Sequence, residues 1–359
     1  MNSSQIQPSG ARWPCIMAVA LAFSLSACAT RNTAPTRTPV ISGPSLAAPG
    51  DGTAKPTPTL GPFQIELPPR HSPPVIDWRP PLYPIPWAIS PYDHFYFARP
   101  IAADEINWPL ASYRYGGVFF EDVVHTGVDI DAPYGTKILA AGPGTVVWAD
   151  WGLFLEAPGA LEDPYGLAVV LRMDFGHKDE PLYSVYAHMS QIIAVRGQHV
   201  ETGDVLGLVG ATGATTGPHV HFEVRWKQNS FHHTYNPELW MAPPEGWGQL
   251  AGRITDSHNN ALQLLDVRVR NTVSNELRLV RTYGAGAVNP DPYYEENMVL
   301  GDLPAGLYRI SFLWDNAEQQ EWMYVYPGQV TYFTFRGDEG FKLGPPPAPQ
   351  LDGFPSPVP

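Results

Sequence analysis

Histidine and carboxylate side chains recur at short spacings between residues 125 and 221. His125 and Asp129 occur in the segment HTGVD. Residues four apart face the same side of an extended chain, and a bend at Gly127 lets both side chains address one point. Neutral imidazole and carboxylate are suitable ligands for zinc. Taken alone, however, this pair is explained more simply as a surface turn with two polar residues.

A second pair of histidines, His219 and His221, occurs in the segment GPHVHFEV. A spacing of two places both imidazoles on one face of a strand, while Val220 and Phe222 point to the other face. Two neighbouring imidazoles are costly to bury unless they share a task, because both tend to become charged near neutral pH. Without further context, an exposed polar face is the simpler interpretation.

The remaining candidates are weaker. His188 closes the apolar segment YSVYAH and on its own is an ordinary histidine. Asp131 is interpreted as a turn residue or as a support to the candidate ligands, and Glu223 as a strand or rim residue. Four further histidines match no motif and are expected at the surface: His177, His199, His232 and His233.

The elements that must position these residues are predicted to be strands. From about residue 90 the chain consists of short apolar or alternating runs bounded by Gly, Pro and Asp, and no long segment has a helical period. We therefore expect an all-β fold, with a compact antiparallel domain over residues 89–243. The runs expected as strands in it are residues 136–141, 144–149, 167–173, 182–187 and 220–226.

A second β-rich segment covers residues 249–337. Residues 308–313 alternate with a period of two. The runs expected as strands in this segment are residues 252–255, 267–271, 277–282, 306–313, 322–326 and 330–336. This pattern favours a small β-sandwich. The segments GRITD (252–256) and LPAGLY (303–308) resemble carboxypeptidase-regulatory-like, prealbumin-type sandwiches. The segment has no cluster of His, Asp and Glu, and we interpret it as an accessory domain.

The termini indicate export. Residues 1–27 contain one basic residue, Arg12, and an apolar run at 16–26 that has the length of a signal peptide. The segment LSAC ending at Cys28 resembles the bacterial lipobox, which implies cleavage before Cys28 and lipidation of its thiol. The alternative is an ordinary secretory signal. Residues 28–88 are predicted to form a Pro-rich disordered tether, and residues 338–359 a Pro-rich tail.

The composition of the chain limits the classes of function that it can have. A length of 359 residues suggests about two domains. The net charge is −13 without a basic cluster, which argues against nucleic acid as a partner. Both cysteines, Cys15 and Cys28, precede the folded part, so a metal there must be held by His and carboxylates. The composition leaves the oligomeric state open.

Taken together and in order, the motifs resemble the lysostaphin/LytM-type peptidoglycan zinc metalloendopeptidases. The resemblance covers about residues 108–237 and includes the first and last histidine motifs, YAHM at 186–189, and the Gly-rich hairpin between residues 197 and 213. It implies that His125, Asp129 and His221 hold one Zn²⁺ per chain and that His188 and His219 act in catalysis. It also implies peptidoglycan stem peptides or cross-links as substrate. Together with the lipobox-like segment at Cys28, this predicts a lipoprotein on the outer side of the cytoplasmic membrane.

The chemistry of such a site agrees with these roles. Three protein ligands leave one zinc position for water, whose pKa zinc lowers to about 7. One remaining imidazole can move a proton and another can stabilise the developing oxyanion, although the sequence does not settle which does which. Residues 151–160 and 175–181 are long connections that we expect to wall the substrate groove.

Two other functions are compatible with parts of the sequence. In the first, the chain is a non-catalytic wall-binding or regulatory module that activates another wall hydrolase, but the complete ligand set argues against it. In the second, the hairpin at residues 197–207 belongs to a biotinyl or lipoyl carrier domain. Such carriers need a lysine at the tip of a hairpin, and the sequence has none between Lys178 and Lys227.

Overall fold

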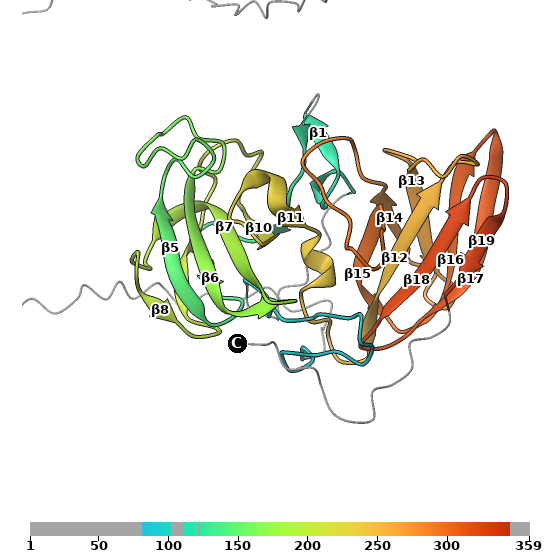
Figure 1. Ribbon diagram of the computed structural model, residues 1–359, viewed down its shortest axis with the longest axis horizontal. Coiled ribbons are helices and arrows are strands. Elements are labelled where there is room, and N and C mark those ends of the chain that lie inside the picture. The colour runs from blue at the N-terminus through green and yellow to red at the C-terminus, as the bar shows by residue number, and fades with distance from the viewer. Residues whose placement is uncertain (1–80, 102–110, 121–122, 345–359) are drawn as a thin grey trace, which may run out of the picture. The chain divides into compact units, whose positions relative to one another are not determined.

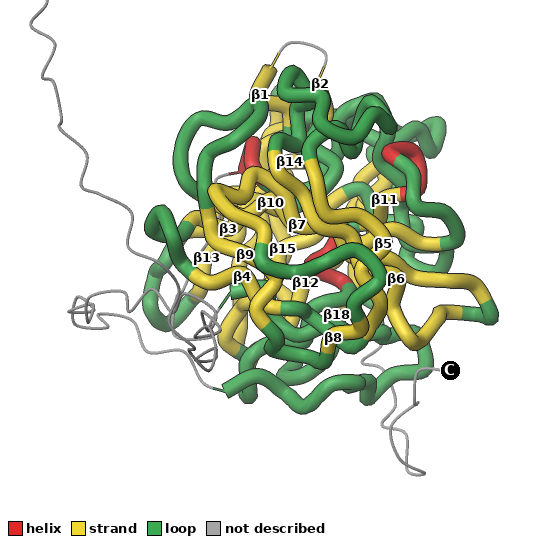
Figure 2. Tube along the Cα trace, turned by 90° about the vertical axis from the view of Figure 1, so that its left-hand side faces the viewer, coloured by secondary structure: helices red, strands yellow, loops and turns green. Residues whose placement is uncertain are grey.

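The computed structural model describes residues 81–101, 111–120 and 123–344. The predicted leader, Cys28, most of the predicted tether and residues 345–359 lie outside these ranges. Within the described residues, strands dominate and helix is limited to three 3-10 turns (Figure 2). The described part contains no helix long and apolar enough to cross a membrane. The predicted all-β fold class is confirmed.

A nine-stranded sheet forms the first lobe (Figure 1). Its central path runs β11-β10-β7-β6-β5-β8, with β3 paired to β10 and β9 paired to both β4 and β7. All of these pairings are antiparallel. The strands are β3 (Val128–Asp131), β4 (Lys137–Leu139), β5 (Gly144–Asp150), β6 (Leu167–His177), β7 (Glu180–Ile192), β8 (His199–Val200), β9 (Val205–Val209), β10 (His219–Trp226) and β11 (Thr234–Tyr235).

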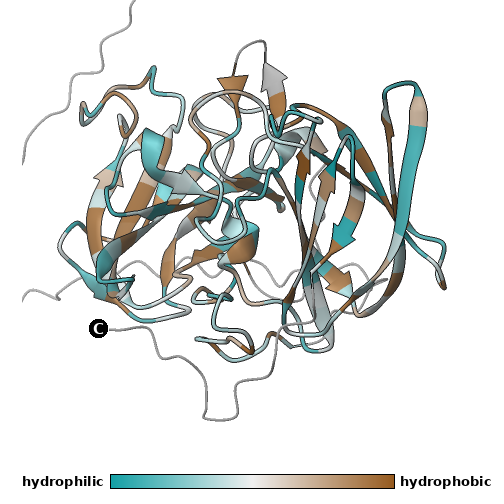
Figure 3. Ribbon diagram, turned by 45° about the vertical axis from the view of Figure 1, so that its right-hand side comes forward, coloured by the Kyte–Doolittle hydropathy of each residue, from teal (hydrophilic) through white to brown (hydrophobic). Residues whose placement is uncertain are grey.

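The alternation of side chains in the sequence explains this sheet. In β10, Val220, Phe222 and Val224 point into the hydrophobic core, while the residues between them face the other side. The same change between hydrophilic and hydrophobic residues is visible along many of the strands in Figure 3. A small separate hairpin, β1 (Val118–Phe120) and β2 (Val123–Val124), precedes β3.

The second lobe is a β-sandwich of two four-stranded sheets, as expected from the sequence. One sheet has the order β15-β12-β18-β19 and the other β14-β13-β16-β17. Their inward side chains, among them Ile254, Phe312 and Phe333, form one buried cluster. The strands are β12 (Trp247–Thr255), β13 (Asp266–Asn271), β14 (Leu277–Arg281), β15 (Met298–Pro304), β16 (Gly306–Trp314), β17 (Ala317–Val325), β18 (Val330–Arg336) and β19 (Gly340–Leu343).

The second lobe differs from the expectation at two strands. Residues 338–359 were expected to be a tail, yet β19 lies within them and pairs antiparallel with β18. The predicted sandwich also omitted β15, because Gly301, Asp302 and Pro304 give that strand the composition of a turn. At the other end of the fold, Tyr83 donates its backbone N–H to Pro243, so the described end of the predicted tether lies against the first lobe.

The two lobes share buried contacts. The described residues of both lobes belong to one compact unit. Trp240 and Met241 of the first lobe belong to the same buried cluster as Ala251, Val299 and Val330 of the second. Three short 3-10 turns are η1 (Ala111–Tyr113), η2 (Phe231–His233) and η3 (Pro237–Leu239). Glu238 in η3 forms a buried ion pair with Arg114 and accepts the backbone N–H of Gly301 at 3.1 Å. The sandwich is therefore packed against the first lobe.

Buried acids lie at this contact. Glu296 accepts the hydroxyl of Tyr283 at 2.9 Å and the backbone N–H of Asp291 at 2.8 Å. Asp93 accepts the hydroxyl of Tyr294 at 2.8 Å, and its other carboxylate oxygen is buried and has no hydrogen-bond partner among the described residues. Burial, opposed in part by these hydrogen bonds, raises the pKa of Asp93 to about 7 and that of Glu296 to about 8.

These raised pKa values predict a pH-dependent stability. The folded chain binds more protons than the unfolded chain between the ordinary carboxyl pKa of about 4 and the folded values, so stability falls as pH rises through this window. We expect the denaturant midpoint to decrease from about pH 5 to about pH 9. In the variant Asp93→Asn with Glu296→Gln, which keeps a neutral group at each site, that decrease is smaller. An unchanged slope in the variant would assign the effect to other groups.

Candidate metal centre

The pairing of β3 with β10 assembles the centre. Their antiparallel register places Asp129 opposite His221 and Asp131 opposite His219. His125 lies just before β3 and reaches the same place through a bend at Gly127. A side chain at Gly127 would meet the backbone oxygen of Phe222 at 2.5 Å and the His221 ring at 2.8 Å. Glycine is therefore needed there for close approach of the two strands.

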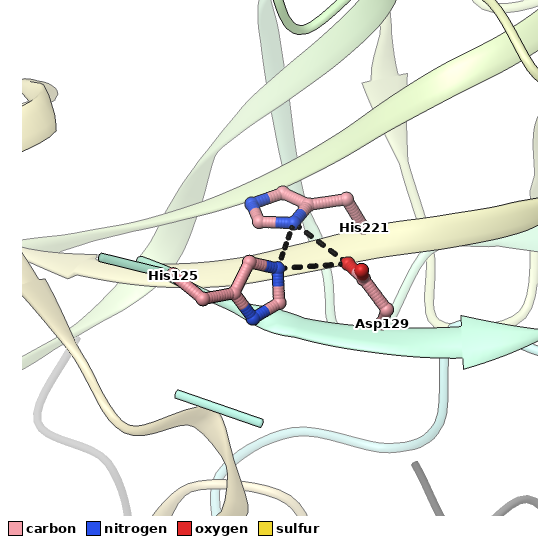
Figure 4. A group of neighbouring side chains, drawn as sticks. All are labelled: His125, Asp129 and His221. Carbon is pink, nitrogen blue, oxygen red and sulfur yellow. Dashed lines mark hydrogen bonds and ion pairs between the residues drawn. The ribbon is translucent and has the colours of Figure 1, made fainter. Parts of the chain in front are cut away.

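Three side-chain atoms converge on one point (Figure 4). Nε2 of His125 lies 2.9 Å from Oδ1 of Asp129 and 2.9 Å from Nδ1 of His221. Nδ1 of His221 and Oδ1 of Asp129 are also 2.9 Å apart. All three residues are buried. The candidate ligand set His125, Asp129 and His221 is thus brought together by segments almost a hundred residues apart.

The opposite nitrogen of each imidazole is already engaged. His125 donates from Nδ1 to the backbone oxygen of Arg114 at 3.2 Å, and His221 donates from Nε2 to Oε1 of Glu223 at 3.1 Å. The two facing nitrogens therefore carry lone pairs, and they meet a carboxylate oxygen. Three converging lone pairs repel one another unless a cation lies between them. This donor set, oriented by its outer hydrogen bonds, fits a metal ion.

Glu223 lies in strand β10, which is one of its two expected places, but it is not at the rim. Its side chain is fully buried, and its oxygens accept hydrogen bonds from Thr126 and Tyr165 at 2.6 Å and from Nε of Arg225 at 2.8 Å. Burial alone would raise the pKa of Glu223, but the charge of Arg225 and the hydrogen bonds of its partners lower it overall. A charged carboxylate therefore orients the His221 ring through its Nε2 nitrogen, on the edge opposite the candidate metal position.

This arrangement also favours positive charge at His221. Burial lowers the pKa of His221, but hydrogen bonds and charges from Asp129 and Glu223 outweigh burial and raise that pKa to about 9. Two carboxylates on opposite edges of one buried imidazole attract a cation, which is either a proton on the ring or a metal ion at Nδ1.

His188 and His219 flank the same point. His188 donates from Nδ1 to Thr212 and His219 from Nδ1 to Gly217, each to a backbone oxygen at 2.8 Å. Their ring centroids are 4.8 Å apart. Nε2 of His219 lies 3.5 Å from Oδ2 of Asp129 and is buried without a hydrogen-bond partner in the described structure. In both rings, Nε2 is therefore the nitrogen left for a reacting group.

The surroundings of His188 give it an uncommon backbone conformation and a lowered pKa. It has a positive φ of 61° at the point where β7 pairs with both β6 and β9, a conformation uncommon for residues other than glycine. Burial, together with the neighbouring charges of His221 and His219, lowers the pKa of His188 to about 3. The ring is consequently neutral near pH 7, with a lone pair at Nε2.

A groove of about 640 Å³ opens over the five residues. The predicted contribution of residues 151–160 to its wall agrees with the structure, because Phe154 lines it. No residue of 175–181 is among the described lining residues, so that expectation was wrong. The walls are otherwise largely apolar and include Tyr113, Val124, Tyr165, Phe231 and Ala287.

The other candidates mostly follow the expectation. Asp131 is exposed at the end of β3, and His199 is exposed and paired with Asp174 at 2.6 Å. His232 is exposed at the mouth of the groove, and His233 is half-buried. His177 is half-buried rather than exposed, because its ring packs against other aromatic side chains. These neighbours are His94, Trp226 and Trp240.

The sandwich lobe supports the ligand His125. Residues Arg114 to Gly117 hold His125 through backbone hydrogen bonds, including that from Gly116 to its carbonyl oxygen at 2.8 Å. The same segment contacts the loop after β14. Gly284 donates its backbone N–H to Gly116 at 2.8 Å, and Asn289 donates its backbone N–H to the hydroxyl of Tyr115 at 2.7 Å. The position of one ligand therefore depends on both lobes.

Comparison with known proteins identifies the first lobe. Residues 123–233 match the family model described as Peptidase family M23. This part of the chain therefore belongs to peptidase family M23, in agreement with the resemblance seen in the motifs.

Curated relatives match only in part. The DD-carboxypeptidase/endopeptidase Mpg of Neisseria meningitidis is 34% identical over 127 residues, which are 35% of this chain and 26% of that protein. The murein hydrolase activator EnvC of Escherichia coli is 31% identical over 137 residues, or 37% of this chain and 28% of that protein. The chain thus spans about a quarter of the length of these relatives. Among solved structures, the catalytic domain of the prophage-encoded M23 protein EnpA from Enterococcus faecalis is 30% identical, with 40% of this chain and 95% of that one covered and a TM-score of 0.31.

Sequence reasoning missed the support beneath the ligands. Arg225 lies on the same face of β10 as His221 and Glu223, and Thr126 directly follows His125, so their polar character was a usable signal. Tyr165 carried no such signal, because it follows a Pro- and Asp-rich loop and meets Glu223 only in the fold.

The contact with the sandwich can be tested at two glycines. Gly116 has a φ of +78°, and a methyl group there would lie 2.3 Å from Cδ1 of Tyr283. Gly135 has a φ of +83° with nothing within 4 Å of such a group. We expect Gly116→Ala to lower both the melting temperature and the metal affinity by more than Gly135→Ala, which measures backbone strain alone. Equal effects would mean that the sandwich does not hold this segment in place.

The role of Glu223 can be tested by two substitutions. Glu223→Gln keeps the shape but removes the charge that faces His221, and we expect metal affinity to fall about 10- to 100-fold in chelator competition. Glu223→Ala also leaves Arg225 buried without its partner, and should cost about 3–5 kcal/mol of stability in denaturant unfolding. Unchanged metal affinity in the Gln variant would show that Glu223 serves stability alone.

Proposed function

We propose that this chain is a zinc-dependent endopeptidase that cleaves peptide bonds of bacterial peptidoglycan, in stem peptides or cross-links. One observation carries the proposal. The buried metal centre has two further histidines beside it, each with Nε2 free to exchange a proton, at the floor of a groove. Membership of residues 123–233 in a peptidase family supports the same assignment.

The donor set favours zinc as the metal. His125, Asp129 and His221 offer two imidazole nitrogens and one carboxylate oxygen, a combination that suits zinc better than calcium or magnesium. Three protein ligands are characteristic of catalytic zinc sites. When bound there, zinc supplies Lewis acidity and lowers the pKa of a coordinated water.

The flanking histidines supply proton transfer and hydrogen bonding. Nδ1 of each ring is held by a backbone carbonyl, so a proton can be gained or lost only at Nε2. We assign to His188 and His219 the transfer of the proton of the attacking water to the leaving amine nitrogen, and the stabilisation of the developing oxyanion. The division of these two roles between them is left open.

The peptide is bound in the groove above these residues. Its apolar walls exclude water from the reacting bond, and they offer a bound strand of peptide the side chains of Phe154 and Tyr113, which both line the groove. The curated name of the Neisseria meningitidis relative, a DD-carboxypeptidase/endopeptidase, supports a wall peptide as substrate.

We further propose that the protein is exported and anchored. The lipobox-like segment at Cys28 supports a lipoprotein on the outer side of the cytoplasmic membrane, in the cell envelope. Stable anchoring by lipid takes more than one acyl chain. The Pro-rich stretch that follows would let the catalytic lobe reach wall polymer away from the membrane.

A non-catalytic, regulatory module is the second candidate. It is favoured by the similarity to a relative named as a murein hydrolase activator. The complete set of three ligands and two flanking histidines in this chain supports an enzyme instead, because a purely regulatory surface has no need of that chemistry.

Two histidine variants test the proposal. His219→Ala should abolish hydrolysis of a defined muropeptide, followed by mass spectrometry, while most of the zinc stays bound. His221→Ala should lose the zinc itself. His199→Ala, at an exposed histidine away from the centre, is the control and should retain both. Wild-type protein without about one zinc per chain, and without activity after zinc addition, would refute the assignment.

A further inference from the structure

One face of the sandwich carries a cluster of arginines. In the sheet β14-β13-β16-β17, the outward side chains of β13 include Arg268 and Arg270, and those of β16 include Arg309. The register places Arg270 opposite Arg309, and Arg268 opposite Ser311 on the same face. Three guanidinium groups therefore gather at the centre of one sheet face in a chain of net charge −13.

No carboxylate among the described residues forms an ion pair with these three arginines. Neither Arg268 nor Arg309 forms an ion pair there, and Arg270 donates only to neutral oxygens of Asn275 at 3.1 Å. Nearby acids are engaged elsewhere, since Asp266 pairs with Arg281 and Glu276 with Arg278. Like charges directly opposite each other in a sheet destabilise it. Such an arrangement is expected where the charges serve an external anion.

Large apolar side chains border the arginines. Trp322 of β17 lies directly opposite Arg309, and Tyr324 lies two residues further along the same strand, opposite Leu307. They are 47% and 46% exposed. On the other side of the cluster, Leu277 lies opposite Arg270 and is also exposed. The face therefore presents, in one row across the four strands, an apolar residue, two arginines and an indole.

We propose that this face binds the peptidoglycan polymer itself, through the carboxylates that its stem peptides carry and the sugar rings of its glycan strands. The proposal rests on the proposed function, which brings this polymer to the groove. Arginine matches carboxylate geometry with two parallel hydrogen bonds, and exposed Trp and Tyr offer rigid amphipathic surface on which sugar rings pack.

The charge pattern favours this occupant over a second copy of the chain. A two-fold pairing of this face with itself would bring arginine against arginine without a carboxylate between them. An extended polymer with carboxylates at intervals meets the cluster and the aromatic pair together. The flat sheet face suits such a polymer, because it offers contact along a line across the strands.

Binding to insoluble, protein-free peptidoglycan tests the proposal. The full chain is used with His219→Ala, so that the polymer stays intact, and the bound fraction is measured by sedimentation. Adding Arg270→Gln with Arg309→Gln should weaken binding about tenfold or more. The matched control is Arg253→Gln with Arg336→Gln, which removes the same charge from ion-paired positions on the other sheet and should change binding less than about twofold. Trp322→Ala should also weaken binding.

If both double variants weaken binding to peptidoglycan equally, the proposal is overturned, because the loss of net charge would then explain the weaker binding. Unchanged binding in the Arg270 and Arg309 variant would also overturn it. In that case the face would instead be a site for a protein partner.

Two further measurements keep these outcomes interpretable. Hydrolysis of a soluble muropeptide, measured without the His219 substitution, should be unchanged by either double variant. If a variant no longer sediments with peptidoglycan but still hydrolyses the muropeptide, the change concerns binding by the sandwich face alone. If the wild-type chain sediments normally but does not hydrolyse the muropeptide, only the proposed peptidase activity is refuted. Because the substitutions relieve like-charge repulsion, the melting temperature of the Arg270 and Arg309 variant should not fall. A fall would assign the arginines to the fold and overturn the proposal.

Discussion

The antiparallel register between β3 and β10 is the constraint on which the centre depends. It sets Asp129 opposite His221, and a slip of one residue would turn each side chain to the opposite face of the sheet. The same strand β10 pairs with β7, which places His221 opposite Ala187 and brings His188 to the centre. The core residues of β10, such as Phe222, secure this register because they must stay buried.

Beneath the ligands, electrostatics and hydrogen bonding reinforce the geometry. Glu223 receives hydrogen bonds from four side chains, and one of them is the ring of His221. A carboxylate buried in this way would be costly without the charge of Arg225 beside it. The ligand ring is thus held in one orientation by a polar cluster within an otherwise apolar sheet, and the lone pair at Nδ1 is directed at Asp129.

Much of the site could be predicted from the sequence. The class of fold and most strands followed from alternation, whereas the convergence of His125, Asp129 and His221 followed from the family resemblance that the ordered motifs carry. The burial of Glu223 and the partial burial of His177 did not, because each depends on partners distant in the chain, Tyr165 for Glu223 and Trp240 for His177. Strand β15 was missed for a local reason, since its turn-like composition is overridden by pairing with β12. The leader, Cys28 and the domain limits given from composition remain predictions.

The contact between Gly116 and Gly284 has a consequence for how this protein can be divided. A fragment cut at the limits of the family match, residues 123–233, would contain every ligand but would omit the backbone that orients the first of them. Such a fragment would also expose the apolar surface that Trp240 and Val330 cover together in the intact chain. In this chain, therefore, the unit that folds around the metal centre is larger than the unit that carries its chemistry.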